Sequence, residues 1–166
     1  MSGLLELIDM KNLIIGLGNP ILGDDGVGWR VAEEVERAIT NRPDVEVDCV
    51  ALGGLSMMER LTGYDFVVII DAFFTGSAPV GTVNQYLLNE LPDLSSGHTT
   101  AIHDTSLRNA LNIGRGMDIP LPLDENIHIV AVEAGNIYDF SESLSPLVEA
   151  AVPEATARVL ELLNNN

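Results

Sequence analysis

The chain has 166 residues, of which 46% are hydrophobic, which is enough for one well-buried domain and too little for two. Its 25 acidic and 8 basic residues give a formal net charge of -17. This charge argues against nucleic acids and anionic membranes as partners, because both are bound through clustered lysines and arginines. We therefore expect residues 1–166 to form a single domain with neither partner.

The N-terminal segment, residues 1–11, carries Glu6 and Asp9 and lacks the basic start and long apolar core of a secretory signal. No apolar run in the chain approaches the roughly 20 residues of a membrane span. These features predict a cytoplasmic protein. The one cysteine, Cys49, cannot form an internal disulfide, and its apolar surroundings favour a small core residue over a nucleophile.

The most informative stretch of the chain is residues 12–30, NLIIGLGNPILGDDGVGWR. Its apolar run ends in a glycine-rich turn, and amphipathic periodicity resumes after Gly28, which predicts a strand, a turn and a helix. A dinucleotide-binding fingerprint requires glycine where this chain has Ile21. A P-loop continues with lysine after its second glycine, whereas here Gly23 is followed by two aspartates. Neither nucleotide-binding motif is complete.

Asp24 and Asp25 place two carboxylates at the predicted start of the first helix. Backbone N–H groups at a helix start support carboxylates while their outer oxygens bind a ligand, so a cation or an amine fits this turn better than a phosphate. Asp24 also has a structural interpretation, as the N-terminal cap of the helix. Capping does not explain Asp25.

Strands and helices alternate along the next part of the chain. Helical spacing predicts a first helix with an apolar face of Val27, Val31, Val35 and Ile39. Residues 45–52 predict a second strand, and residues 55–62 a short helix. Residues 66–70 are the most uniformly apolar run, which predicts a central strand buried on both faces. Asp71 stands at the carboxyl end of that strand, the edge at which open α/β sheets bind ligands.

Residues 82–88 predict a further strand. No helix is available between Asp71 and this strand for a parallel crossover, so we expect it to be antiparallel. After a loop-like stretch, His103 and Asp104 open a predicted helix that ends near residues 114–116.

Residues 127–132 predict the last strand, and Ser145 and Pro146 begin the last helix, whose inward-facing residues are expected to be Leu147, Val148, Ala151, Val159 and Leu162. The alternation of elements predicts an α/β protein with three layers, α/β/α. Its five-stranded sheet is expected to be mostly parallel, with one antiparallel strand.

Asp25, Asp71 and His103 occupy positions that can converge on one edge of such a sheet. Two carboxylates and one imidazole suit zinc, nickel, manganese or iron, with open positions for water or a substrate group. Each residue also has a structural interpretation, as a capping residue, a turn former or a helix-start residue. His98, in a predicted loop, is a secondary ligand candidate, and His128, inside a strand, is expected to be structural.

The sequence indicates no serine or cysteine nucleophile. It contains no Gly-x-Ser-x-Gly elbow, and Cys49 has no histidine near it in the chain. If the protein hydrolyses a bond, metal-activated water or a polarised carbonyl is the more natural route.

Four segments in order, NLIIGLGNPILGDDGVG, VVIIDAFF, HDTSL and LSPLVEAAVPEA, resemble the successive motifs of the hydrogenase maturation endopeptidases, which process the large subunit of nickel-iron hydrogenases. The resemblance runs from about residue 12 to residue 160. It implies an α/β/α fold with one antiparallel strand. It also implies an enzyme that removes a C-terminal extension from the large-subunit precursor once nickel has been inserted.

Carried over position by position, the resemblance makes Asp25, Asp71 and His103 the metal-contacting and catalytic residues. The nickel they meet is supplied by the precursor, so the site can favour loaded over empty substrate. Some relatives have the longer Glu where this chain has Asp25, and Asp104 adds a charge beside the imidazole. Residues 133–142 are a candidate for choosing a particular hydrogenase. A protease that admits a large precursor can act as a monomer.

Two other functions fit parts of the sequence. GLGNP also resembles the first motif of bacterial peptidyl-tRNA hydrolases, but ILGDDGVGWR departs from the series that follows in those enzymes, and the charge opposes tRNA. The second is a nickel-binding checkpoint or chaperone that uses the same Asp25, Asp71 and His103 without cutting a peptide bond.

Overall fold

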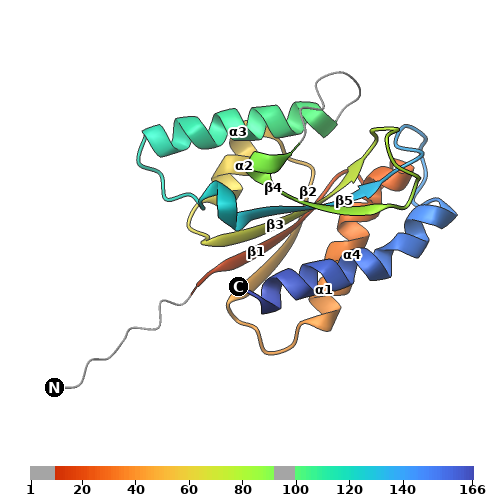
Figure 1. Cartoon of the computed structure of the whole chain (residues 1–166), viewed down its shortest axis with the longest axis horizontal. Helices are drawn as coiled ribbons and strands as arrows, with labels where there is room; N and C mark the ends of the chain where they lie inside the picture. The colour runs from red at the N-terminus through yellow and green to blue at the C-terminus, as the bar shows by residue number, and fades with distance from the viewer. Residues whose placement is uncertain (1–9, 92–99) are drawn as a thin grey trace.

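The computed structural model describes residues 10–91 and 100–166, with side chains in the second range described from residue 107 onward. A five-stranded sheet of order β2-β1-β3-β5-β4 lies between two layers of helices (Figure 1). β4 pairs antiparallel with β5, and the other pairings are parallel. This arrangement confirms the predicted fold class. The strands are β1 (Asn12–Leu17), β2 (Val45–Val50), β3 (Phe66–Phe73), β4 (Val83–Leu87) and β5 (Ile127–Glu133).

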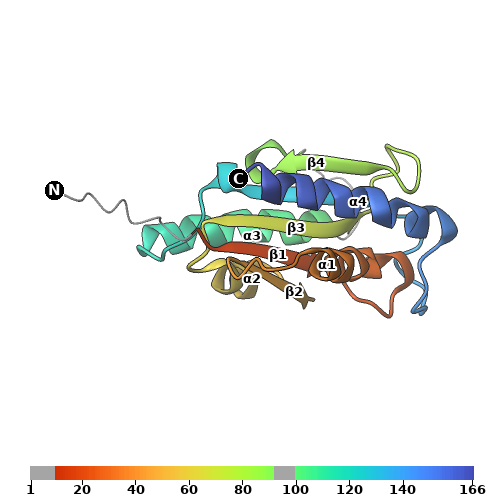
Figure 2. The ribbon, with the colours of Figure 1, turned by 90° about the horizontal axis from the view of Figure 1, so that it is seen from below.

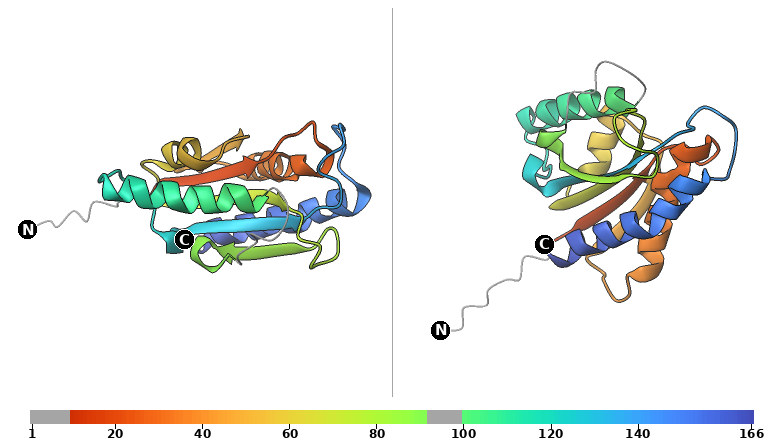
Figure 3. Two further views of the ribbon diagram at one scale, coloured as in Figure 1. Left: turned by 90° about the horizontal axis from the view of Figure 1, so that it is seen from above. Right: turned by 45° about the vertical axis from the view of Figure 1, so that its right-hand side comes forward.

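Helices cover both faces of the sheet (Figures 2 and 3). One face carries α1 (Val27–Ala38) and α4 (Pro146–Asn164), and the other carries α2 (Gly54–Leu61) and α3 (Thr100–Gly116). Short 3-10 turns are η1 (Gly23–Gly26), η2 (Leu88–Glu90) and η3 (Asp124–Asn126). Within the described ranges, no helix is long and apolar enough to cross a bilayer.

β3 has the character expected of a central strand, because every one of its residues is buried. Side chains alternate along it, so that Val68 and Ile70 pack toward α1 and α4, whereas Val67 and Ile69 pack toward α2 and α3. A strand between two helical layers needs apolar side chains on both faces, which explains the continuous run.

Two sequence-based expectations need correction. Asp71 lies within β3 instead of at its end, because pairing with β5 continues as far as Phe73 and Glu133. Leu147 was expected to face inward but is 62% exposed, since the buried face of α4 begins at the next residue. That face consists of Val148, Ala151, Val152, Ala155, Val159 and Leu163, and Leu162 is half-buried against it.

Gly28 allows α1 to begin directly against the carboxyl ends of β1 and β3. A Cβ atom at this position would lie 2.4 Å from the carbonyl oxygen of Leu17 and 2.5 Å from that of Ile70. Both contacts are with backbone, which cannot move aside as a flexible side chain can. The glycine therefore sets how closely the first helix approaches the sheet.

We expect Gly28→Ala to lower the free energy of unfolding by at least about 2 kcal/mol, since overpacking outweighs the better helix propensity of alanine. Urea denaturation followed by circular dichroism measures the loss. Gly116→Ala is the matched control, because a Cβ atom there meets nothing within 4 Å. Equal stability of the two variants would contradict this account of Gly28.

Candidate functional site

A cavity of about 250 Å³ lies at the carboxyl ends of β1, β2 and β3, and we call it the carboxylate cavity. The strand order reverses here, because β2 lies on one side of β1 and β3 on the other. Open α/β sheets bind ligands at such a switch point. The cavity is lined by Leu17, Gly18, Asn19, Leu22, Asp25, Ala51, Leu52, Asp71, Ile137 and Tyr138.

Asp25 reaches this cavity from η1. The turn that carries it depends on Gly18, which has φ +132° and whose Cβ atom, if present, would lie 2.0 Å from the carbonyl oxygen of Asp25. The half-buried carboxylate of Asp25 accepts a hydrogen bond from the backbone N–H of Asn19 at 2.7 Å. The turn after β1 therefore holds one oriented carboxylate at the cavity wall.

Asp71 supplies the second carboxylate from β3. It is 6% exposed, and its Oδ1 accepts a hydrogen bond from the backbone N–H of Ala72 at 2.9 Å. On β5 its register partner is Ala131, whose small side chain is buried beside it in the sheet. The structure thus brings Asp25 and Asp71 to one cavity, where two negative charges favour a cationic ligand.

His103 lies in the first turn of α3, in the part of the helix whose side chains are not described. The helix predicted to open at His103 is present but begins three residues earlier, at Thr100, and the role of the imidazole stays a prediction. His98 lies outside the described residues. Among the residues whose side chains are described, no three His, Cys, Asp or Glu side chains gather closely enough to hold a metal ion.

Asp24 does not cap α1 as the sequence suggested. The chain enters that helix through η1, and no side chain among the described residues caps it. The buried Asp24 carboxylate instead accepts backbone N–H bonds from Gly135, Asn136 and Ser145 at 3.1, 3.0 and 2.6 Å, and a bond from the Ser145 hydroxyl at 2.9 Å. Because Ser145 is the N-cap residue of α4, Asp24 joins the turn after β1 to that helix and to the loop after β5.

Glu133, at the end of β5, is a second buried carboxylate with a structural role. It is 3% exposed and accepts bonds of 2.8 Å from the backbone N–H groups of Thr75 and Gly76 and from the Thr75 hydroxyl. These bonds fix the loop after β3. This role is not visible in the sequence, because the partners lie 57 and 58 residues away in the chain.

Cys49 and His128 have structural surroundings. The half-buried thiol of Cys49 lies 3.9 Å from the carbonyl oxygen of Trp29, and burial raises its pKa to about 11, with nearby acidic residues adding to the effect. It is therefore protonated at neutral pH and a poor nucleophile. The ring of His128 lies 5.0 Å from that of Phe66, and burial lowers the pKa of this imidazole.

Most of the cavity lining was not predicted from the sequence. Ala51 and Leu52 follow β2, and Tyr138 belongs to the loop after β5. The available signal was positional, because residues that follow parallel strands meet at one sheet edge. That signal identifies the lining residues only when the strand order β2-β1-β3 is known, and the sequence alone did not predict this order.

Comparison with known proteins identifies one family. The sequence model of a family described as hydrogenase maturation protease matches residues 29–162, which include Asp71 and His103 and begin after Asp25. The hydrogenase 2 maturation protease of Escherichia coli (strain K12) is 24% identical over 157 residues, or 95% of this chain and 93% of that protein. The hydrogenase expression/formation protein HupD of Thiocapsa roseopersicina is 25% identical over 156 residues, or 93% of this chain and 68% of that protein.

Solved structures share the fold. The hydrogenase maturating endopeptidase HybD from E. coli matches with a TM-score of 0.78 at 23% identity, over 94% of this chain and 93% of that chain. The maturation protease HybD from Thermococcus kodakarensis matches with a TM-score of 0.69 at 23% identity, over 92% of this chain and 99% of that chain.

We expect Asp24→Asn to lower the free energy of unfolding by about 3 kcal/mol, because the amide loses the charge and turns an N–H₂ group toward buried donors. Urea denaturation measures this loss. Asp139→Asn is the control, since Asp139 is exposed on the loop after β5, and it should change stability by less than about 0.5 kcal/mol. If Asp24→Asn is as stable as the unmodified protein, Asp24 does not join these segments.

Proposed function

The chain belongs to the hydrogenase maturation protease family, and from that membership we propose that it removes the C-terminal extension of a nickel-loaded large-subunit precursor of a nickel-iron hydrogenase. The observation that carries this proposal is the pair of carboxylates, Asp25 and Asp71, in one cavity at the switch point of the sheet. The proposal includes a single domain that acts in the cytoplasm as a monomer.

Nickel is part of the substrate in this proposal, and Asp25, Asp71 and His103 recognise it. Backbone N–H groups orient both carboxylates before substrate arrives, which lowers the cost of ordering them on binding. An O,O,N ligand set without thiolate completes the coordination of an ion that the precursor brings, so loaded precursor binds better than empty precursor.

The placement of α3 supports His103 as the third ligand. Position 103 lies in α3 about one helical turn before Leu107. Leu107 lines a second cavity together with Asp71. The N-terminal end of α3, which contains position 103, therefore lies beside the cavity that Asp71 lines.

Water is the attacking group in our proposal. The Cys49 thiol, protonated at neutral pH, does not supply a nucleophile. A metal ion beside a peptide bond polarises its carbonyl or acidifies a bound water. In this proposal Asp25 and Asp71, which line the carboxylate cavity, and His103 act as proton acceptors.

The loop after β5 is our candidate for choosing the partner hydrogenase. Tyr138 lines the carboxylate cavity while 57% exposed, and Phe140 is 86% exposed. Exposed aromatic side chains beside a binding site favour protein recognition, because aromatic residues are enriched in interfaces. Asp24 accepts hydrogen bonds from the backbone N–H groups of Gly135 and Asn136, so the start of this loop is held in place beneath its aromatic side chains.

We expect Asp71→Asn and Asp25→Asn each to slow cleavage of nickel-loaded precursor by roughly 100-fold or more, because each variant loses a ligand and a proton acceptor. The readout is the intact mass of the precursor over time. Circular dichroism confirms that the variants fold, and Asp118→Asn, an exposed acid just after α3 and outside both the cavity and the loop after β5, should cleave at the normal rate.

Unchanged cleavage by both variants would exclude the carboxylate pair from the site. Tight binding of loaded precursor by the unmodified protein without any loss of mass would support the alternative of a nickel-binding checkpoint or chaperone.

A further inference from the structure

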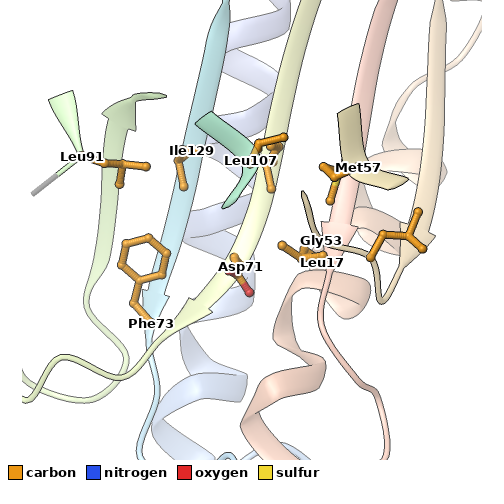
Figure 4. A pocket seen from close by; sticks show the side chains of 10 residues that line it. Leu17, Gly53, Met57, Asp71, Phe73, Leu91, Leu107 and Ile129 are labelled. Atoms are coloured by element: carbon orange, nitrogen blue, oxygen red, sulfur yellow. The ribbon is translucent and has the colours of Figure 1, made fainter. Parts of the chain in front are cut away.

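An apolar cavity of about 30 Å³ adjoins the carboxylate cavity (Figure 4). The two share Leu17, Leu52 and Asp71. In Figure 4, Asp71 lies between Phe73 on one side and Leu17 and Gly53 on the other. The apolar cavity is lined by Leu17, Leu52, Gly53, Met57, Ile69, Asp71, Phe73, Leu91, Leu107 and Ile129.

The walls of this cavity select for an apolar occupant. Apart from Gly53 and Asp71, each lining residue carries an aliphatic, aromatic or thioether side chain, and most are almost fully buried. A polar group here would lose its hydration without gaining partners from such walls. A volume of about 30 Å³ leaves room for about two or three heavy atoms, which matches a short aliphatic side chain.

We propose that the apolar cavity binds a short aliphatic side chain of the residue next to the scissile bond, and that Met57 sets the size of this side chain. The inference rests on the proposed protease function. Asp71 lines both cavities, so a substrate whose reacting bond faces Asp71 has its neighbouring residue within reach of the apolar cavity. One residue of extended chain advances only about 3.3 Å.

Met57 is the residue best placed to set this preference. It comes from α2, is 1% exposed, and fills one side of the cavity with a long flexible side chain (Figure 4). Met58 offers a matched control in the same helix and the same hydrophobic cluster. Its sulfur lies toward Gly114 of α3, and it is not part of the cavity lining.

The test uses nickel-loaded large-subunit precursor from the organism of origin, with Ala, Val, Leu or Phe placed at each position flanking the scissile bond. Relative kcat/KM values are measured from intact mass. We expect the unmodified protein to prefer Ala or Val over Phe at one of these positions by at least about 10-fold. Met57→Ala should shift the preference toward Leu or Phe by a similar factor, whereas Met58→Ala should keep the original preference at a comparable loss of Tm.

Met57→Val removes less of the side chain and tests the same shift if Met57→Ala does not fold. An unchanged preference in a folded Met57 variant overturns the inference alone, because cleavage itself persists. A shift of the same size in Met58→Ala also overturns it, since destabilisation would then explain the change. Failure of the unmodified protein to cleave any loaded precursor overturns the proposed function and the inference with it.

Discussion

The buried carboxylate of Asp24 is the interaction on which the site geometry depends. It ties the turn after β1 to the loop after β5 and to Ser145, the N-cap residue of α4, so segments that are distant in the chain are held together. Removing it would leave several buried N–H groups without an acceptor, at about 1 to 3 kcal/mol each. Asp25 is the next residue, so the same anchor fixes its placement at the cavity wall.

Two cavities of opposite character meet at Asp71. The carboxylate cavity suits a cation, and the apolar cavity suits an aliphatic group. In the proposed function, one bound substrate segment therefore places its metal ion in the first cavity and an aliphatic side chain in the second, and both contacts contribute to specificity. Both stand on β1 and β3, the two strands on either side of the switch point. Both cavities therefore lie at the carboxyl end of the parallel strands.

Local patterns were enough to predict the architecture and part of the site. The apolar run of β3 and the missing crossover before β4 are visible in the sequence. So is the position of Asp25 after the first strand, whereas Asp71 lies inside β3 and not after it. The role of Asp24 was not predictable, because two of its partners lie 111 and 112 residues away. Leu147 is exposed because the buried face of α4 begins at Val148. The spacing of apolar residues alone did not show which of these two neighbours faces the sheet. His103 as a ligand remains a prediction.

The most direct test of the central claim is the intact mass of a large-subunit precursor incubated with the unmodified protein, in nickel-loaded and nickel-free form. The account predicts loss of a C-terminal peptide from the loaded precursor alone, because the carboxylates of the cavity recognise the ion it carries. Equal cleavage of both forms would contradict recognition through nickel. Binding of loaded precursor without cleavage would contradict the protease function.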